Sequence, residues 1–390
     1  MSSFRRKASP SPSSAASATA SAPIPTARRG SRPFLNGQAL VSSGLRDLDA
    51  LVGGGQLLGS VALLEAAEPL AAPLVDDLLR YFAGEGVAAG QRTAVVAEDA
   101  AAFVALRLPR ELSLAQRQYE KYLKQPASDT NSRFCHSFDL ARAMHAEMAA
   151  ANPPEAIDVC DLPSPTYGAV LARLEPLVAE AAASQDQVLR VCVRELGSPL
   201  FGPPTQAHMA ALLGFVRRLR ALAAGRPVVC QLSGAAGLAA FPPHFLNELR
   251  HASDYVLQLS AFAGERDLLP PELRDFHGLL ELRKLARVHA LAAFAAPATR
   301  FGIKRDVRKL RIENLSILAL RTLSEPFTWS SSFCSSSLRA TRRLSSSERV
   351  FWQRTSNPEG TCLSSTQLRT LLIFCPPLPD RRGICSSAHL

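Results

Sequence analysis

Lysine is absent between Lys7 and Lys121, and this gap bears directly on nucleotide binding. A P-loop needs the pattern G-x-x-x-x-G-K-[ST], whose backbone amides and lysine surround the phosphates. The loop would follow the first buried strand, expected at 60–65, and would lead into a helix expected near 74–84. The segment at that place, residues 65–73, has no glycine, no lysine and two acids that would repel phosphate. The sequence therefore excludes ATP hydrolysis through a P-loop of its own.

Four glycines do occur nearby, but on the wrong side of the strand. Gly53, Gly54, Gly55 and Gly59 all precede the apolar run at 60–65. In parallel sheets phosphates bind at the carboxyl ends of strands, on the loop that enters a helix. These glycines are instead typical of a tight turn that feeds the chain into the sheet.

Other absences narrow the function further. No apolar run approaches the ~18–20 residues of a membrane helix, so no membrane association is expected. None of the eight cysteines forms a C-x-x-C pair, which leaves zinc fingers and thioredoxin-like redox motifs unsupported. Residues 1–25 have no apolar segment of the kind found in secretory signals. We expect no catalytic residue, no bound nucleotide, no cofactor and no metal ion.

The net charge of +10 lies in the two tails rather than in the folded part. Residues 1–35 carry +6 and residues 318–390 carry +5, which leaves residues 36–317 at −1. The overall charge is therefore weak evidence for a cationic nucleic-acid binder.

The same division predicts three regions. Residues 1–35 are rich in Ser, Ala and Arg and are expected to be a disordered tail, with an organellar transit peptide as the alternative. Residues 36–317 are expected to be the folded domain. Residues 318–390 hold both tryptophans, four cysteines and fifteen serines without a helical or strand period, and we interpret them as an aberrant, unstructured C-terminus.

Within 36–317, apolar strands alternate with amphipathic helices, which predicts an α/β fold with a doubly wound, mostly parallel sheet and flanking helices. Residues 107–135 are polar and irregular and are expected to be a long insertion. The expected strands are 60–65, 93–97, 188–193, 227–232 and 255–262, followed by closing strands at 277–285 and 287–294. The expected helices are 74–84, 167–183, 205–222 with Thr205 as its cap, and 243–251.

Several side chains have both a functional and a structural interpretation. Glu195 could end a strand as a Walker B acid, but without a P-loop a surface charge is the favoured interpretation. Ser198 stands in Gly-Ser-Pro rather than G-x-S-x-G, and a turn is expected there. His136 beside Cys135 has no partner at metal-ligand spacing, so structural packing is expected.

Two basic segments deserve the same comparison. Arg217, Arg218 and Arg220 lie on the outer face of an amphipathic helix, where a solvated surface is the simple interpretation. Lys304, Arg305, Arg308 and Lys309, together with Arg311, form a denser cluster with only Asp306 opposing them in sequence. These four are the candidate RNA contacts, and phosphate contacts would add salt-dependent affinity without sequence choice.

Several strings in the chain are recognisable. The entry NGQ at 36–38 and SSGLRDLD at 42–49, with the glycine turn, resembles the start of RecA-like ATPase domains. The strings SRFCHSFDL at 132–140, ELGSPLF at 195–201, FHGLL at 276–280 and FGIKR at 301–305 resemble the Elongator complex subunit 4 family, over about 36–317.

That resemblance implies a RecA-like fold without a P-loop and a non-catalytic role. It implies a hetero-hexameric ring with Elongator subunits 5 and 6, which binds tRNA and supports carboxymethyl-type modification of wobble uridine (U34) by the catalytic Elongator subcomplex. The implied location is the cytoplasm, with the nucleus left open as a second compartment. A RecA/KaiC-like ATPase of recombination or signalling remains the alternative, and it would need a phosphate loop.

Overall fold

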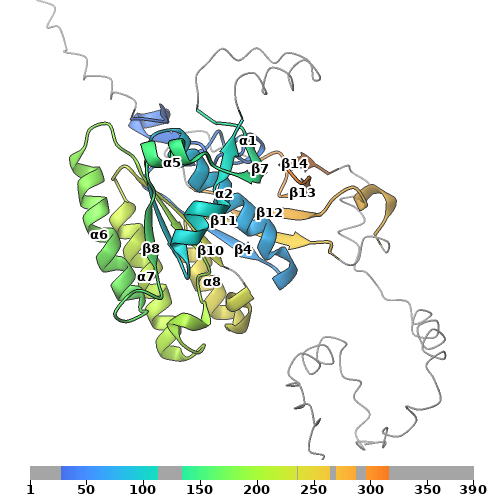
Figure 1. Cartoon of the computed structure of the whole chain (residues 1–390). Coiled ribbons are helices and arrows are strands. Elements are labelled where there is room, and N and C mark those ends of the chain that lie inside the picture. Colours follow the sequence, from blue (N-terminus) through green and yellow to red (C-terminus); the bar gives the residue numbers. More distant parts are fainter. Residues whose placement is uncertain (1–27, 113–133, 235, 264–268, 287–295, 316–390) are drawn as a thin grey trace, which may run out of the picture. The chain divides into compact units, whose positions relative to one another are not determined.

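The computed structural model describes residues 28–112, 134–234, 236–263, 269–286 and 296–315 (Figure 1). The predicted C-terminal region 318–390 and the predicted strand 287–294 lie outside these residues, as does 113–133 of the predicted insertion. None of the described helices combines the length and hydrophobicity that a bilayer crossing requires.

Nine strands of the described residues form one sheet in the order β14-β13-β12-β11-β4-β10-β9-β5-β8. Six of them are parallel: β4 (Val61–Ala66), β5 (Arg92–Ala97), β8 (Glu155–Asp158), β9 (Leu189–Val193), β10 (Val228–Gly234) and β11 (Tyr255–Ala261). Three antiparallel strands extend the sheet beyond β11: β12 (Gly278–Lys284), β13 (Arg300–Arg305) and β14 (Leu310–Asn314). The mostly parallel, doubly wound α/β architecture predicted from the sequence is confirmed.

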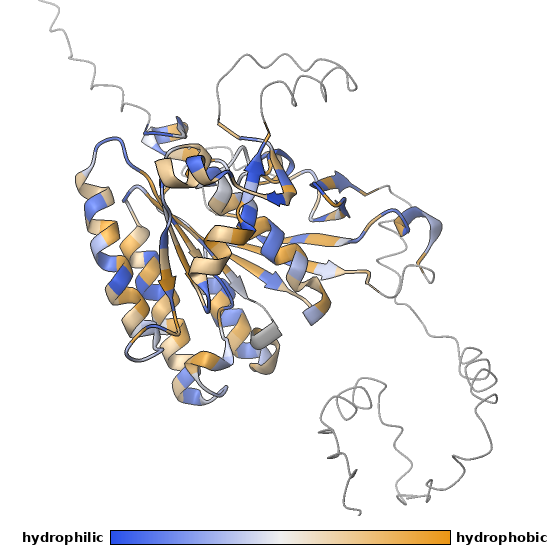
Figure 2. Ribbon diagram, viewed as in Figure 1, coloured by the Kyte–Doolittle hydropathy of each residue, from blue (hydrophilic) through white to orange (hydrophobic). Residues whose placement is uncertain are grey.

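Helices cover both faces of the parallel strands (Figure 1). On one face lie α6 (Tyr167–Ala183), α7 (Gln206–Ala223) and α8 (Pro243–Ala252), and on the other lies α2 (Ala72–Ala88). Alternation along β9 serves both cores: Leu189 and Val191 face the α6–α8 layer, whereas Cys192 faces α2. Figure 2 shows the hydrophobic surfaces of these helices turned toward the sheet. Thr205 caps α7 as predicted, because its hydroxyl accepts the amide of His208 at 3.3 Å.

The predicted N-terminal tail is too long. Residues 28–35 are ordered: β1 (Ser31–Pro33) pairs with β2 (Ala39–Val41), which pairs with β3 (Gln56–Leu57), and α1 (Arg46–Leu51) follows β2. The Arg28 guanidinium donates to the carbonyls of Ser184 at 2.7 Å and Gln187 at 3.0 Å. Three of the arginines that suggested a disordered tail, Arg28, Arg29 and Arg32, therefore bind the folded part, and of the predicted tail, residues 1–27 lie outside the described structure.

Shorter elements complete the described residues. After β5 come α3 (Ala100–Ala102) and a π-helical turn (Phe103–Arg107). The next strand, β6 (Pro109–Glu111), pairs with β7 (Phe138–Ala143), and α5 (Ala146–Ala151) follows β7. Residues 109–111 therefore belong to a strand, and the expectation of an irregular segment from 107 onward is wrong for them. Single-turn 3₁₀ helices occur at 35–37, 69–71, 199–201 and 271–273, with a longer one at 236–240.

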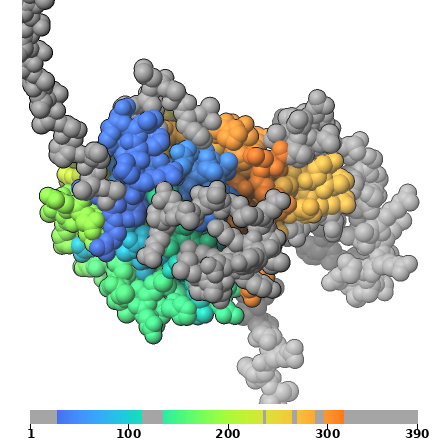
Figure 3. Space-filling model, turned by 90° about the horizontal axis from the view of Figure 1, so that it is seen from above, coloured from blue at the N-terminus to red at the C-terminus, as the bar shows by residue number. Residues whose placement is uncertain are grey.

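The start and the end of the described chain meet on one face. The amide of Ile312 on β14 donates to the Asp47 carboxylate of α1 at 3.0 Å, and the amide of Leu310 donates to the Tyr81 hydroxyl at 3.1 Å. Figure 3 shows this proximity, with the N-terminal segment in blue beside the β12–β14 segment in orange. These side chains also occupy the outer amides of the edge strand β14.

A buried polar cluster joins the segments around Ser42 and His136 to α2 and the sheet. Glu85 of α2 is fully buried and accepts two hydrogen bonds from His136, through its amide and its ring Nδ1, both at 2.8 Å. Arg190 of β9 is also fully buried; it stacks on the Phe82 ring at 4.7 Å and donates to the carbonyl of Ser42 at 2.8 Å. Burial lowers the pKa of Arg190, and the nearby Glu85 carboxylate opposes that shift. The cluster therefore holds α2, β9 and the segments around Ser42 and His136 together in one core.

Candidate functional site

The crevice at the carboxyl ends of β4, β9 and β10 is the place to look for a ligand. In open α/β sheets, ligands bind where the strand order reverses, and β4 lies between β10 and β11 at such a point. The chain leaves β4 through residues 66–71 and enters α2 at Ala72. This is the position that a phosphate loop would occupy.

The loop after β4 is occupied by contacts within the protein. The Glu65 carboxylate, at the end of β4, accepts two hydrogen bonds from Arg250 Nε, at 3.0 and 2.9 Å. Burial raises the pKa of Glu65, and the Arg250 charge partly offsets the rise. Glu68 accepts the amide of Ala261 on β11. Both acids of the predicted phosphate-repelling segment are therefore bound to neighbouring elements.

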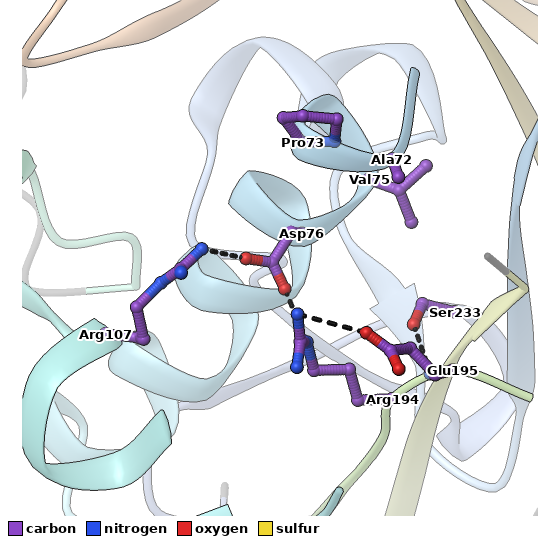
Figure 4. A pocket seen from close by; sticks show the side chains of 8 residues that line it. All are labelled: Ala72, Pro73, Val75, Asp76, Arg107, Arg194, Glu195 and Ser233. Carbon is purple, nitrogen blue, oxygen red and sulfur yellow. Dashed lines mark hydrogen bonds and ion pairs between the residues drawn. The ribbon is translucent and has the colours of Figure 1, made fainter. Parts of the chain in front are cut away.

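Beneath the loop lies a chain of ion pairs (Figure 4). Asp76, in the second turn of α2, binds Arg107 through one oxygen and Arg194 Nε through the other, the latter at 2.8 Å. A second nitrogen of Arg194 lies 3.2 Å from Glu195 Oε1. Burial alone would lower the pKa of Arg194, but the charge and hydrogen bond of Asp76 reverse this and the net shift is upward. Both arginines of the crevice are thus ion-paired with one carboxylate on α2.

The space left in the crevice is small. A pocket of about 200 Å³ remains, lined by Ala72, Pro73, Val75, Asp76, Arg107, Arg194, Glu195 and Ser233. Pockets that hold a drug-sized ligand measure roughly 300–1,000 Å³. The pocket is therefore smaller than a typical ligand site.

Glu195, the predicted strand-end acid, has an unusual backbone. Its φ of 58° lies in the left-handed region, which side chains with a Cβ rarely adopt. Its amide donates to the Ser233 hydroxyl at 3.0 Å, and its carboxylate turns to Arg194. No group of three metal-binding side chains occurs among the described residues, so the structure gathers no ligand set around this carboxylate.

The other candidates from the sequence have structural roles. The Ser198 hydroxyl accepts the amide of Leu200, which makes it the cap of a 3₁₀ turn. His136 binds Glu85, and burial raises the pKa of the neighbouring Cys135 thiol to about 12. Arg217, Arg218 and Arg220 are exposed on α7, as the solvated-surface interpretation predicted.

The basic cluster of Lys304, Arg305, Arg308 and Lys309 lies at the end of β13 and in the turn between β13 and β14. The structure places acids beside it that are distant in sequence: Arg305 binds Asp77 at 2.6 Å and Arg308 lies 3.9 Å from Asp139. Lys304 binds Glu313 at 2.8 Å and covers the Phe276 ring. Arg308 nevertheless keeps 69% of its side chain exposed. Asp306 is the one acid near the cluster in sequence, but in the folded chain Asp77, Asp139 and Glu313 also lie beside it.

Sequence reasoning missed the central residues of the crevice, Asp76, Arg107 and Arg194. No motif marks them, because the partners are 31 and 118 residues apart along the chain. A tyrosine was also missed: the Tyr167 hydroxyl accepts the amide of Gly197 at 3.2 Å and pairs with His208 Nε2 at 3.0 Å, which anchors the ELGSPLF segment.

Comparisons with known proteins agree with the resemblance seen in the sequence. The family model described as PAXNEB protein matches residues 24–126 and 116–337, which extends past the expected end near 317. "Elongator complex protein 4" of Danio rerio is 28% identical, over 74% of this chain and 84% of the relative. The human protein of the same name is 26% identical, over 74% of this chain and 79% of the relative.

Among solved structures, a KaiC-like protein from the hyperthermophilic archaeon Pyrococcus horikoshii is similar with a TM-score of 0.41 and 13% identity, covering 70% of this chain and 98% of that one. At this level the likeness supports no conclusion about ligand or activity.

Proposed function

The chain belongs to the PAXNEB protein family, that of Elongator subunit 4, and from this membership we propose that it is a non-catalytic subunit of an Elongator complex. The chain is matched to 84% and 79% of the length of these two relatives.

The non-catalytic role is supported mainly by the composition and the ion pairs of the crevice after β4. Residues 66–73 contain neither glycine nor lysine, and the Asp76 carboxylate is ion-paired with both nearby arginines. A phosphate group bound there would have to displace Asp76 from Arg107 and Arg194, and it would meet Glu195 and Glu68 as additional negative charges. We propose that the fold is retained for its surfaces.

The surfaces of the domain would then contact the neighbouring subunits of a ring. We propose that the chain alternates with Elongator subunits 5 and 6 in a hetero-hexamer, which binds tRNA and supports carboxymethyl-type modification of U34 by the catalytic subcomplex. The cytoplasm is the proposed location, with the nucleus as a second compartment. Buried free cysteines such as Cys192 and Cys230 are compatible with a reducing compartment.

Within that assembly, Lys304, Arg305, Arg308 and Lys309 are the proposed RNA contacts of this subunit. The exposed guanidinium of Arg308 at the β13–β14 turn is best placed to reach a phosphate. Each lost phosphate contact should lower the slope of log affinity against log salt by about 0.7–0.9. Arg308→Ala in the reconstituted ring should show this loss in tRNA titrations, whereas Arg217→Ala on α7 should not.

Affinity purification of the tagged full chain from its native cells, followed by mass spectrometry, tests the proposal. Subunits 5 and 6 and the catalytic subcomplex should be the main specific partners. Their absence, in preparations where the bait is intact and folded, would overturn the proposal. ATP hydrolysis by the pure chain, abolished by Glu195→Gln, would instead support the alternative of a RecA/KaiC-like ATPase.

A further inference from the structure

Residues 28–31 have the sequence Arg-Arg-Gly-Ser, with arginines three and two positions before the serine. Basophilic serine/threonine kinases select their substrates by this charge pattern, because acidic groups of the kinase bind both guanidinium groups of an extended peptide. The sequence therefore makes Ser31 a candidate phosphate acceptor, and the structure shows what a phosphate on this side chain would meet.

In the folded chain the same two arginines bind the turn between α6 and β9. Arg28 donates to two backbone carbonyls of that turn, at 2.7 and 3.0 Å. The amide of Arg29 donates to the carbonyl of Asp186 at 3.0 Å, and its guanidinium lies 3.2 Å from the Asp186 carboxylate. We call residues 28–31 the N-terminal anchor. A kinase that binds both arginines therefore competes with the contacts that hold this anchor in place.

Gly30 is required for the docked conformation of the anchor. Its φ of 63° lies in the left-handed region, and a Cβ added there would lie 2.7 Å from Gln91 Nε2 and 2.8 Å from the Ala89 Cβ. The Gln91 side chain is fixed in this position because it donates to the carbonyl of Arg29 at 2.6 Å. An alanine at position 30 is therefore compatible with the pattern that a kinase binds, but not with the docked anchor.

The Ser31 hydroxyl acts as a donor in the docked anchor. It donates to the carbonyl of Arg28 at 2.7 Å, and the amide of Ser31 donates to the same carbonyl at 2.9 Å. Ser31 is half-buried and pairs with Val41 of β2. A phosphoserine carries a charge of about −1.5 to −2 at pH 7 and three strong acceptor oxygens. Phosphorylation therefore replaces this donor with acceptors beside a carbonyl oxygen, which disfavours the docked anchor.

We propose that Ser31 is a phosphorylation site and that a phosphate on it keeps the N-terminal anchor detached. In the reaction, Ser31 Oγ bonds to the γ-phosphorus of ATP while its proton passes to a base of the kinase, and the bond from that phosphorus to the bridging oxygen breaks to release ADP. The anchor leaves its turn before a kinase binds both arginines, and the phosphate then opposes its return. Because β1 is an edge strand, β2 and β3 stay paired when it detaches. The inference concerns this chain alone and does not depend on the proposed function.

Phosphorylation of the purified full chain by ATP and the catalytic subunit of cyclic-AMP-dependent protein kinase, a basophilic kinase, tests the site. Mass spectrometry assigns each phosphate, since the Arg-Arg-x-Ser pattern recurs at 342–345 and a related one occurs at 6–9. Each rate at Ser31 is divided by that of a synthetic peptide, residues 26–36 with the same substitution, so that the preference of the kinase cancels. The wild-type chain should react at least about tenfold more slowly than its peptide, because the docked anchor is protected.

A glycine variant separates the two states of the anchor. Gly30→Ala should raise the ratio of chain to peptide at least about tenfold, since the strain and the clashes of an added Cβ detach the anchor. Gly37→Ala is the matched control: its φ of 73° is similar, but an added Cβ has no atom within 4 Å, and its ratio should stay within about twofold of the wild type. No phosphate on Ser31 of the wild-type chain, or equal ratios for Gly30→Ala and the wild type, would overturn the inference.

Hydrogen exchange measures what the phosphate does to the anchor. In the chain phosphorylated at Ser31, the amides of residues 28–33 and of their partners at 39–41 should exchange faster than in the unmodified chain, because the contacts of the anchor and the β1–β2 pairing are lost. The amides of α7 should exchange at the same rate in both. Unchanged exchange at 28–33 would show that the phosphorylated anchor stays docked, which would contradict the inference.

Discussion

Asp76 offers the sharpest test of whether the crevice is a structural ion-pair network. Its carboxylate is only 10% exposed and binds two guanidinium groups, those of Arg194 and Arg107, which are 28% and 50% exposed. A hydrogen bond to a charged group contributes about 1.5–3 kcal/mol when buried, and a half-exposed pair contributes ~1 kcal/mol or less. Asp76→Asn keeps one acceptor oxygen but leaves the arginines without their counter-charge. We expect a loss of about 2 kcal/mol in the free energy of unfolding.

Differential scanning fluorimetry of the full chain measures this loss. For a domain of this size, 2 kcal/mol corresponds to a fall in Tm of about 4–8 °C. Asp161→Asn is the control, because Asp161 is an exposed carboxylate after β8, and its variant should stay within about 0.5 kcal/mol of the wild type. Repeating the scans at several protein concentrations separates unfolding from dissociation. An unchanged Tm, or a rise of the kind seen when a ligand-binding charge is removed, would refute the structural role.

Three further predictions follow from particular residues. Burial raises the pKa of Asp49 above its ordinary 3.8 in the folded state. The stability of the wild type relative to Asp49→Asn should therefore fall as pH rises above about 4, and a rise would contradict it. Because Glu195 has a φ of 58°, Glu195→Gly should be about 1 kcal/mol more stable than Glu195→Ala in urea denaturation, and equal stabilities would exclude backbone strain there. Tyr167→Phe should cost about 1–3 kcal/mol in the same assay, since it removes the hydroxyl that binds the Gly197 amide and His208 Nε2; a loss below ~0.5 kcal/mol would argue against this anchor.

The parallel sheet could be predicted because each of its strands has a recognisable apolar pattern in the local sequence. The apolar run expected at 60–65 is β4 (Val61–Ala66), and the run expected at 188–193 is β9 (Leu189–Val193). Strands buried on both faces read as continuous apolar segments, and the helices between them have a clear period. For these elements, local pattern and tertiary burial agree.

The closing strand expected at 277–285 is β12 (Gly278–Lys284), but the two strands beyond it, β13 and β14, depend on non-local packing and were missed. β13 (Arg300–Arg305) contains a glycine and three cations, which is an unfavourable composition for a strand. Its place in the sheet relies on the Phe276 ring, which fills the space beside Gly302 so closely that a Cβ there would lie 2.2 Å from a ring carbon. No local pattern reveals a contact of that kind.

In the candidate site, too, some features are visible in the local sequence and others depend on contacts between distant residues. The absence of glycine and lysine after β4 is visible in the sequence and predicts the loss of phosphate binding. What fills the site is not visible, because Asp76 meets Arg107 and Arg194 only after α2 has packed on the sheet. Likewise, Asp77 and Asp139 partly neutralise the basic cluster at 304–309 although they lie far from it along the chain.

The central claim is that this chain acts as a non-catalytic member of a mixed ring. Native mass spectrometry of the full chain co-expressed with Elongator subunits 5 and 6 tests it most directly. We predict one dominant species whose mass corresponds to two copies of each subunit and which retains tRNA added in solution. A homo-oligomer of this chain beside separate complexes of subunits 5 and 6 would contradict it.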